Sequence, residues 1–320
     1  MPRTARLVST LAAPLPFSRP DEAPCLDLWP TTRLLVQRGE RELAVRDLTA
    51  PATSPTVRIP APWPGGIGQG AVSPFGDQAV FTGPHALRAV DLTGNTRWEL
   101  RHRCWAGCAG HTDITAYADD REHGYAGSGS ACFSSDGKLV WAHIPADGDG
   151  GDGADWEEEW VVIDAVDGTV LGRVPTRTAA AGSHHIPHPD PAQMGLSIGE
   201  GQDGAPLRWG RWDGHALALH RTADGSVESE LTTASLAPDD SSVYFDYDGR
   251  FLDADTLVVA TVDGDDELGA ARHWLVTTSP LRPTDELTYP FPVDSLPTGL
   301  GDGTWYTTST TDNSLHLWTL

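Results

Sequence analysis

Three histidines lie close together near the middle of the chain and could hold a metal ion. They are His184, His185 and His188, all within residues 183–190. Imidazole nitrogens are common metal ligands, and a metal-bound water becomes a strong nucleophile near neutral pH. A metal bound there would create a hydrolase or lyase site, with Asp190 or Glu200 as general base.

The polar character of this stretch continues beyond the histidines, so that the whole stretch covers about thirty residues. The further members are Glu200, Asp203, Arg211 and Trp212. This is more polar than one small sheet needs for its stability, so the region is our candidate for the functional face. The alternative interpretation is that imidazoles and indoles cap turns and line a channel with satisfied hydrogen bonds.

A second group with metal-binding chemistry is Cys104, Cys108 and His111. Tetrahedral zinc binds such nitrogen and sulfur ligands. The Cys-x3-Cys spacing is not a standard zinc motif, however, and no second cysteine pair follows. The alternative is a connecting loop with two small buried thiols.

An acidic, glycine-rich stretch resembles a calcium-binding loop in part. Asp147, Asp149, Asp155 and Glu158 fall at positions 1, 3, 9 and 12 of a twelve-residue loop. Position 6, where an EF-hand has glycine, is Asp152, and no helices flank the segment. We therefore predict a flexible acidic insertion over residues 146–158, because runs of Gly and Asp cannot pack.

Other catalytic signatures are missing from the sequence. It has no Gly-x-Ser-x-Gly elbow, no phosphate-binding Gly-x-x-x-x-Gly-Lys and no His-Glu-x-x-His. We expect no cofactor, with a divalent metal as the alternative. Active sites can collect residues from several parts of a chain, so the sequence leaves open whether the chain is an enzyme.

The net charge of −23 restricts the classes of partner. Affinity for nucleic acid or an anionic membrane rests on clustered Lys and Arg, and Lys138 is the only lysine. A protein or peptide, preferably a basic one, is the expected partner of a monomeric chain. Four cysteines and no apolar run of 18 residues predict a cytoplasmic protein without a membrane helix.

The elements that must position these residues are short strands between tight turns. A turn-forming quartet recurs at 73–76, 134–137, 188–191 and 237–240, with starts 61, 54 and 49 residues apart. Units of roughly 40–50 residues built from a turn and strands are typical of propeller blades. The fold class is therefore all-β.

Individual strands can be predicted from apolar runs bounded by Gly, Pro, Asp or Asn. The first four blades have strands at 33–36 and 43–48, at 77–82 and 87–92, at 139–142 and 160–163, and at 207–212 and 215–219; a sixth begins at 256–261 and a last at 303–306. A short fifth blade begins near Leu231. We predict a single β-propeller domain over 1–320 with seven blades, or six if the fifth belongs to the sixth. Residues 5–10 should pair with 315–318 and close the ring.

Two segments resemble the WD40-type propeller family. Residues 312–318 resemble its passage from an Asp-containing turn into an apolar strand ending in Trp-Asp, with Thr319 in place of that Asp. Gly110 and His111 resemble the Gly-His opening of a repeat, and Trp141 follows at a typical distance. The resemblance implies a buried network of His, Ser or Thr, Asp and Trp within a blade.

The expected function is that of a non-catalytic, WD40-like interaction platform with an acidic face. The alternative is a metal-dependent propeller hydrolase or lyase acting on a small molecule at the central channel. A third hypothesis is a carbohydrate binder that uses some of the twelve Trp residues for stacking.

Overall fold

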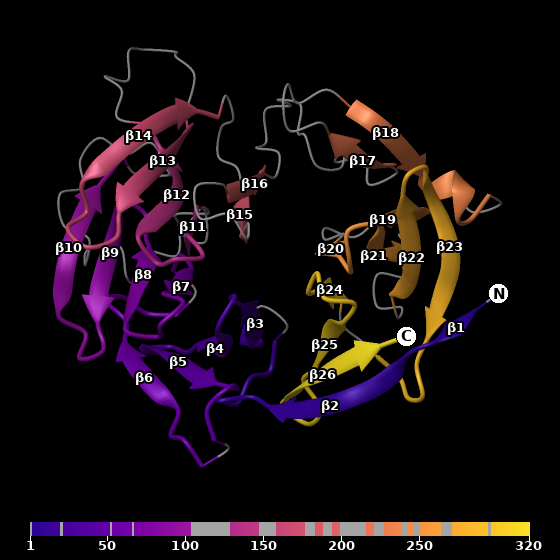
Figure 1. The fold of residues 1–320 in the computed structure, drawn as a ribbon, viewed down its shortest axis with the longest axis horizontal. Helices are drawn as coiled ribbons and strands as arrows, with labels where there is room; N and C mark the ends of the chain where they lie inside the picture. Colours follow the sequence, from indigo (N-terminus) through magenta and orange to yellow (C-terminus); the bar gives the residue numbers. More distant parts are fainter. Residues whose placement is uncertain are drawn as a thin grey trace. The chain divides into compact units, whose positions relative to one another are not determined.

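A computed structural model describes the architecture of the chain (Figure 1). It describes residues 2–19, 22–51, 53–65, 67–103, 129–146, 158–176, 183–187, 194–198, 216–220, 227–238, 242–245, 250–263, 271–293 and 296–320. Strands dominate these residues, and the 3-10 helix η3 (Thr233–Ser235) has three residues. The all-β prediction is confirmed. No helix in the described ranges is long and apolar enough to cross a membrane.

The chain divides into two compact units, and each is considered by itself. One comprises Cys25–Pro206; the other comprises Met1–Pro24 together with Leu207–Leu320. Whether the chain forms the single domain expected from its sequence stays a prediction.

The Cys25–Pro206 unit contains three four-stranded antiparallel sheets, each built from strands consecutive in sequence. This is the sheet type found in propeller blades. The first has β3 (Cys25–Leu28), β4 (Arg33–Arg38), β5 (Glu42–Asp47) and β6 (Val57–Pro60). The second has β7 (Gly70–Val72), β8 (Gln78–Thr82), β9 (Ala86–Asp91) and β10 (Thr96–Arg101). The third has β11 (Ser130–Phe133), β12 (Leu139–Pro145), β13 (Glu158–Asp164) and β14 (Val170–Pro175), and a pair follows with β15 (Ser183–Pro187) and β16 (Met194–Ile198).

The recurring quartets form the same turn in two of these sheets. Gly76 donates its backbone N–H to the carbonyl of Ser73, and Gly137 does the same to Ser134. Both glycines have positive φ, 67° and 71°, which a residue with a Cβ adopts only with strain. The predicted turns at 73–76 and 134–137 are thus confirmed. The quartet at 188–191 lies outside the described residues, and that at 237–240 is described only in part.

The other unit contains a four-stranded sheet, a larger sheet and a strand pair. The four-stranded sheet has the order β2 (Arg6–Ala12), β26 (Ser314–Thr319), β25 (Trp305–Ser309) and β24 (Thr298–Gly299). The larger sheet has the order β1 (Arg3–Thr4), β23 (Leu281–Thr288), β22 (Arg272–Thr278), β21 (Thr256–Asp263) and β19 (Val243–Phe245), with β20 (Arg250–Phe251) also on β21. The pair is β17 (Ala216–His220) with β18 (Val227–Thr232). The sequence predicted that a further blade begins near Leu231. In the structure Leu231 instead pairs with Leu217 on β17.

The two ends of the chain meet in one sheet, as predicted. β2 pairs antiparallel with β26, so that Leu7 is in register with Trp318 and Leu11 with Leu315. Alternate residues of β2 point inward, and Trp318 is fully buried. This pairing covers the outer edge of β26, and an uncovered edge would invite association with other chains.

The same kind of hydrogen bond, from a tryptophan indole to a threonine hydroxyl, occurs inside two sheets of this unit. The indole N–H of Trp274 donates to the hydroxyl of Thr261 at 2.9 Å, and that of Trp318 donates to Thr307 at 2.9 Å. In both, the threonine lies two residues beyond the register partner of the tryptophan on the neighbouring strand. A bond from Trp to Ser or Thr is part of the network implied by the WD40 resemblance.

Candidate functional site

The structure describes few of the residues predicted for a site. His185 is described fully, and His184 is placed in β15 in register with Ser197. Residues outside the described ranges are His188, Glu200, Asp203, Arg211, Trp212, Cys104, Cys108 and His111. No group of three or more His, Cys, Asp or Glu side chains that could hold a metal occurs within the described ranges.

His185 belongs to a buried polar cluster assembled by four strands. Ser130 on β11, His143 on β12 and Trp160 on β13 are consecutive register partners, so they share one face of their sheet. Ser183 and His185 reach this cluster from β15, two residues apart and therefore on one side of the strand. The opposite face of the same sheet is apolar and belongs to the hydrophobic core.

The hydrogen bonds of the cluster have a definite direction. Trp160 Nε1 lies 3.0 Å from His185 Nε2, and His185 Nδ1 lies 2.9 Å from Ser130 Oγ. Because an indole nitrogen can only donate, His185 Nε2 must accept and its proton must reside on Nδ1. Nδ1 then donates to Ser130, whose own proton can go to Ser183 Oγ at 2.6 Å.

This direction decides what the cluster can do chemically. A serine becomes a nucleophile when a histidine nitrogen accepts its proton. Here the imidazole donates to Ser130 instead, and Ser130, Ser183 and His185 are all buried. The arrangement is therefore that of a structural relay between strands. A metal ion on His185 would have to displace one of these hydrogen bonds.

A buried pair formed by an imidazole and a carboxyl group lies on the same face of the sheet. His143 Nε2 is 3.1 Å from the Glu158 carboxylate, and both side chains are at most 2% exposed. Glu158 opens β13, and Ala146, the residue after β12, is also buried, so the two end residues of the acidic insertion expected over 146–158 are part of the folded structure. Glu158, which had been placed at position 12 of a calcium loop, instead pairs with an imidazole. Residues 147–157 lie outside the described ranges.

The segment that carries the WD40 resemblance forms a local hydrogen-bonded group. Ser314 Oγ donates to the Asp312 carboxylate at 2.7 Å, and His316 Nε2 lies 3.0 Å from Ser314 Oγ and 3.3 Å from Asp312. The Ser314 hydrogen bond is the main reason that the pKa of Asp312 is lowered. Since the serine proton goes to the carboxylate, His316 does not activate Ser314 as a nucleophile.

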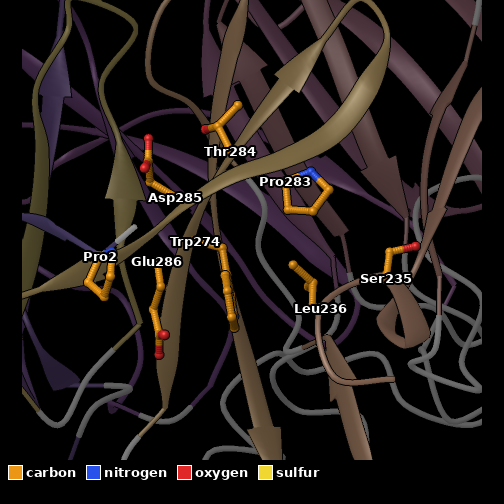
Figure 2. A pocket seen from close by; sticks show the side chains of 8 residues that line it. All are labelled: Pro2, Ser235, Leu236, Trp274, Pro283, Thr284, Asp285 and Glu286. Atoms are coloured by element: carbon orange, nitrogen blue, oxygen red, sulfur yellow. The ribbon is translucent and has the colours of Figure 1, made fainter. Parts of the chain in front are cut away.

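A small pocket of about 290 Å³ lies on the larger sheet of the Met1–Pro24 and Leu207–Leu320 unit. It is lined by Pro2, Ser235, Leu236, Trp274, Pro283, Thr284, Asp285 and Glu286. Figure 2 shows the Trp274 side chain between those of Glu286 and Leu236, whereas Asp285 projects in another direction. Trp274 and Glu286 lie side by side because they are register partners on β22 and β23.

The chemistry of this pocket favours a cation with an apolar stem. Trp274, Leu236 and Pro283 supply apolar surface, and Asp285 and Glu286 supply negative charge. An indole face and a carboxylate attract the same cation by different means, through the ring quadrupole and through the full charge. A volume near 290 Å³ is at the lower limit for ligand pockets, which suits one side chain.

The sequence predictions did not include this pocket. Trp274 stands in an ordinary apolar strand, and Asp285 and Glu286 are eleven and twelve positions further on, beyond a turn. The register of the β22–β23 hairpin also shifts between Leu275 and Val276. The sequence could have indicated that these two strands form a hairpin. The register shift, however, prevents the partner of Trp274 from being found by counting back from the turn.

Comparison with known proteins gives similarity in fold alone. No protein-family model matches the chain, and no curated protein matches its sequence. One similar solved structure is the dihydro-heme d1 dehydrogenase NirN in complex with DHE, with a TM-score of 0.45 and 13% identity over 94% of this chain. This chain spans 63% of the length of that one.

A second similar structure is the β-propeller domain of the Trilobed protease from Pyrococcus furiosus, described as having an open velcro topology. Its TM-score is 0.38 and its identity 11%, over 91% of this chain and 78% of that chain. Neither similarity bears on what this chain binds or does. The four-stranded antiparallel sheets described above nevertheless place the chain among proteins built from blade-like sheets.

Proposed function

We propose that the chain is a non-catalytic, WD40-like propeller that binds a basic segment of a protein or peptide. The observation that carries this proposal is the pocket in which Trp274 lies beside Glu286, with Asp285 also on the lining. A lysine or arginine side chain has the charge and the apolar stem that this lining complements.

The charge of the whole chain supports the same class of partner. A net charge of −23 raises the rate at which basic partners meet the surface and opposes binding of polyanions. The pocket supplies what this long-range field lacks, a defined position for one cationic group. Specificity would then come from the pocket and association rate from the field.

Three further observations support the WD40-like part of the proposal. The sheets with four antiparallel strands have the strand number and pairing of blades, and the Trp-to-Thr hydrogen bond occurs both in one of them and in the larger sheet. Pairing of β2 with β26 supports the closure that such a ring requires. A seven-bladed ring closed at this sheet is the arrangement we propose.

Calorimetric titration with an acetylated, amidated hexa-arginine peptide at physiological salt tests the function. We expect one peptide per chain, and no binding of the matching hexa-glutamate peptide. Glu286→Gln should weaken binding about fivefold, since a partly exposed ion pair contributes about 1 kcal/mol, and Asp285→Asn should weaken it less, because that side chain projects away from Trp274. Trp274→Phe keeps an apolar ring in the pocket but attracts a cation less strongly than the indole does. This variant should also weaken peptide binding.

The matched control is Glu230→Gln, which removes the same charge from an exposed position on β18 outside the pocket lining. It should leave the affinity within about twofold of the parent value. If all four variants bind the peptide equally well, the pocket is not the binding site and the proposed function fails.

A further inference from the structure

One arginine of the chain already contacts two groups that line the pocket. Arg272 on β22 lies over the Trp274 ring, with its guanidinium carbon 4.6 Å from the ring centroid. Its Nε is 2.8 Å from Glu286 Oε1. Arg272 is not itself part of the lining, but both of these partners are.

The strand geometry explains why one cation meets both groups. Arg272 and Trp274 are two residues apart on β22 and therefore share a face, and Glu286 is the register partner of Trp274 on β23. The guanidinium thus lies over the indole while it bonds to the carboxylate beside it. A planar guanidinium suits this double contact better than an ammonium does.

We propose that Arg272 is an internal competitor for the site, and that the natural ligand is an arginine side chain of a basic partner. This inference rests on the proposed function. A ligand guanidinium reaching the Trp274 face and Glu286 would require the same two groups that Arg272 occupies. Binding of the partner therefore includes displacement of Arg272 toward solvent.

The contacts of Arg272 are weak enough to be exchanged. Its side chain is 48% exposed and that of Glu286 is 31% exposed, so water and salt screen the ion pair. Cation–π contacts at exposed positions are also among the weaker interactions of a protein. Arg272 would then lower the affinity for single arginines while it permits binding of segments that make additional contacts.

The test is titration of the Arg272→Gln chain with the same hexa-arginine peptide. We expect the affinity to rise about fivefold, because removal of the competitor frees the indole and Glu286. Arg272→Lys should give a smaller rise, since lysine keeps the charge but stacks less well. The matched control is Arg6→Gln, an exposed arginine on β2 whose loss changes the net charge equally.

The outcomes separate the inference from the function on which it rests. A gain for Arg272→Gln that exceeds the Arg6→Gln gain by about threefold supports competition. Equal gains would mean that only net charge matters, and weaker binding would make Arg272 part of the ligand site; either result overturns the inference. Either of these two results could occur while Glu286→Gln still weakens peptide binding, and in that case the proposed function stands.

A second measurement checks that the gain arises at Glu286. In a chain that already carries Glu286→Gln, Arg272→Gln should have less effect on peptide affinity than in the parent chain. An undiminished effect in the double variant would also overturn the inference. Thermal unfolding of each variant confirms that the comparison is made between folded chains.

Discussion

At the scale of single residues, the hydrogen bond from Trp160 determines the protonation of His185. The indole can only donate, which leaves Nε2 unprotonated and Nδ1 protonated. Nitrogen NMR distinguishes these ring nitrogens. We expect the Nδ1-protonated tautomer in the parent chain at pH 7.5, and loss of this strict preference in Trp160→Phe. An Nε2-protonated His185 in the parent chain would contradict the relay.

A second histidine makes the stability of the fold depend on pH. His102 is buried, and burial is the main reason that its pKa is lowered to about 4. Because the folded chain resists the proton that the unfolded chain accepts near pH 6.5, stability is present above that pH and is lost as the pH falls toward 4.

Urea unfolding at two pH values measures this effect. The contribution of His102 to the unfolding free energy should be about 2 kcal/mol smaller at pH 5 than at pH 7.5. In His102→Gln the difference between the two pH values should shrink by a similar amount. An unchanged pH dependence in the variant would show that other groups are responsible.

Residue types could be predicted from the sequence more easily than their roles. His185 was singled out because histidines gather near it, and the structure places it in a polar cluster. Its partners Ser130 and Trp160 are 55 and 25 residues away along the chain, and strand register brings them together. The direction of the hydrogen bonds, which turns a possible nucleophile into a relay, follows from those partners.

At the scale of elements, the tight turns determine where each strand begins. Gly76 and Gly168 both have positive φ, but a Cβ on Gly76 would meet open space. A Cβ on Gly168 would come within 2.8 Å of the Trp98 ring, which is buried and bonded to the Ala165 carbonyl. The two glycines form a matched pair for separating backbone strain from packing.

We expect Gly76→Ala to lower the unfolding free energy by about 1 kcal/mol, through backbone strain alone. Gly168→Ala should cost about 2–3 kcal/mol, because strain and the displacement of Trp98 add. Chemical denaturation of both variants gives the two values. Equal losses would mean that the Trp98 side chain moves away at no cost.

The strands were predictable because short apolar runs end at Gly, Pro, Asp or Asn. This signal located β4, β5, β8, β9, β12, β13 and β21 within a few residues. The pairing of β18 with β17 was missed, since no local feature of Leu231 says whether it ends one sheet or opens the next. The pocket was missed for a similar reason, because the register shift between β22 and β23 hides which residues of the two strands lie side by side.

At the scale of the whole molecule, the fold depends on a strand from one end of the chain pairing at the other end. A chain lacking residues 2–12 would leave the outer edge of β26 uncovered next to buried Trp318. We expect a lower melting temperature and aggregation at concentrations at which the full chain remains monodisperse. Calorimetry and light scattering measure both.

The control for this deletion is Val8→Thr. Val8 is 48% exposed, and the substitution leaves the β2 backbone in place. It should change the melting temperature by only a few degrees, because surface substitutions are usually within about 0.5 kcal/mol of neutral. A deletion variant as stable as the control would contradict the claim that β2 stabilises the fold by covering the edge of β26.

The central claim is that a basic partner binds where Trp274 and Glu286 meet, and the indole N–H resonances of the folded chain test it most directly. On titration with the hexa-arginine peptide, the Trp274 resonance should shift and saturate together with the calorimetric binding curve. The resonance of Trp160, in the other unit, should stay in place. Saturable binding with an unmoved Trp274 resonance would contradict the claim.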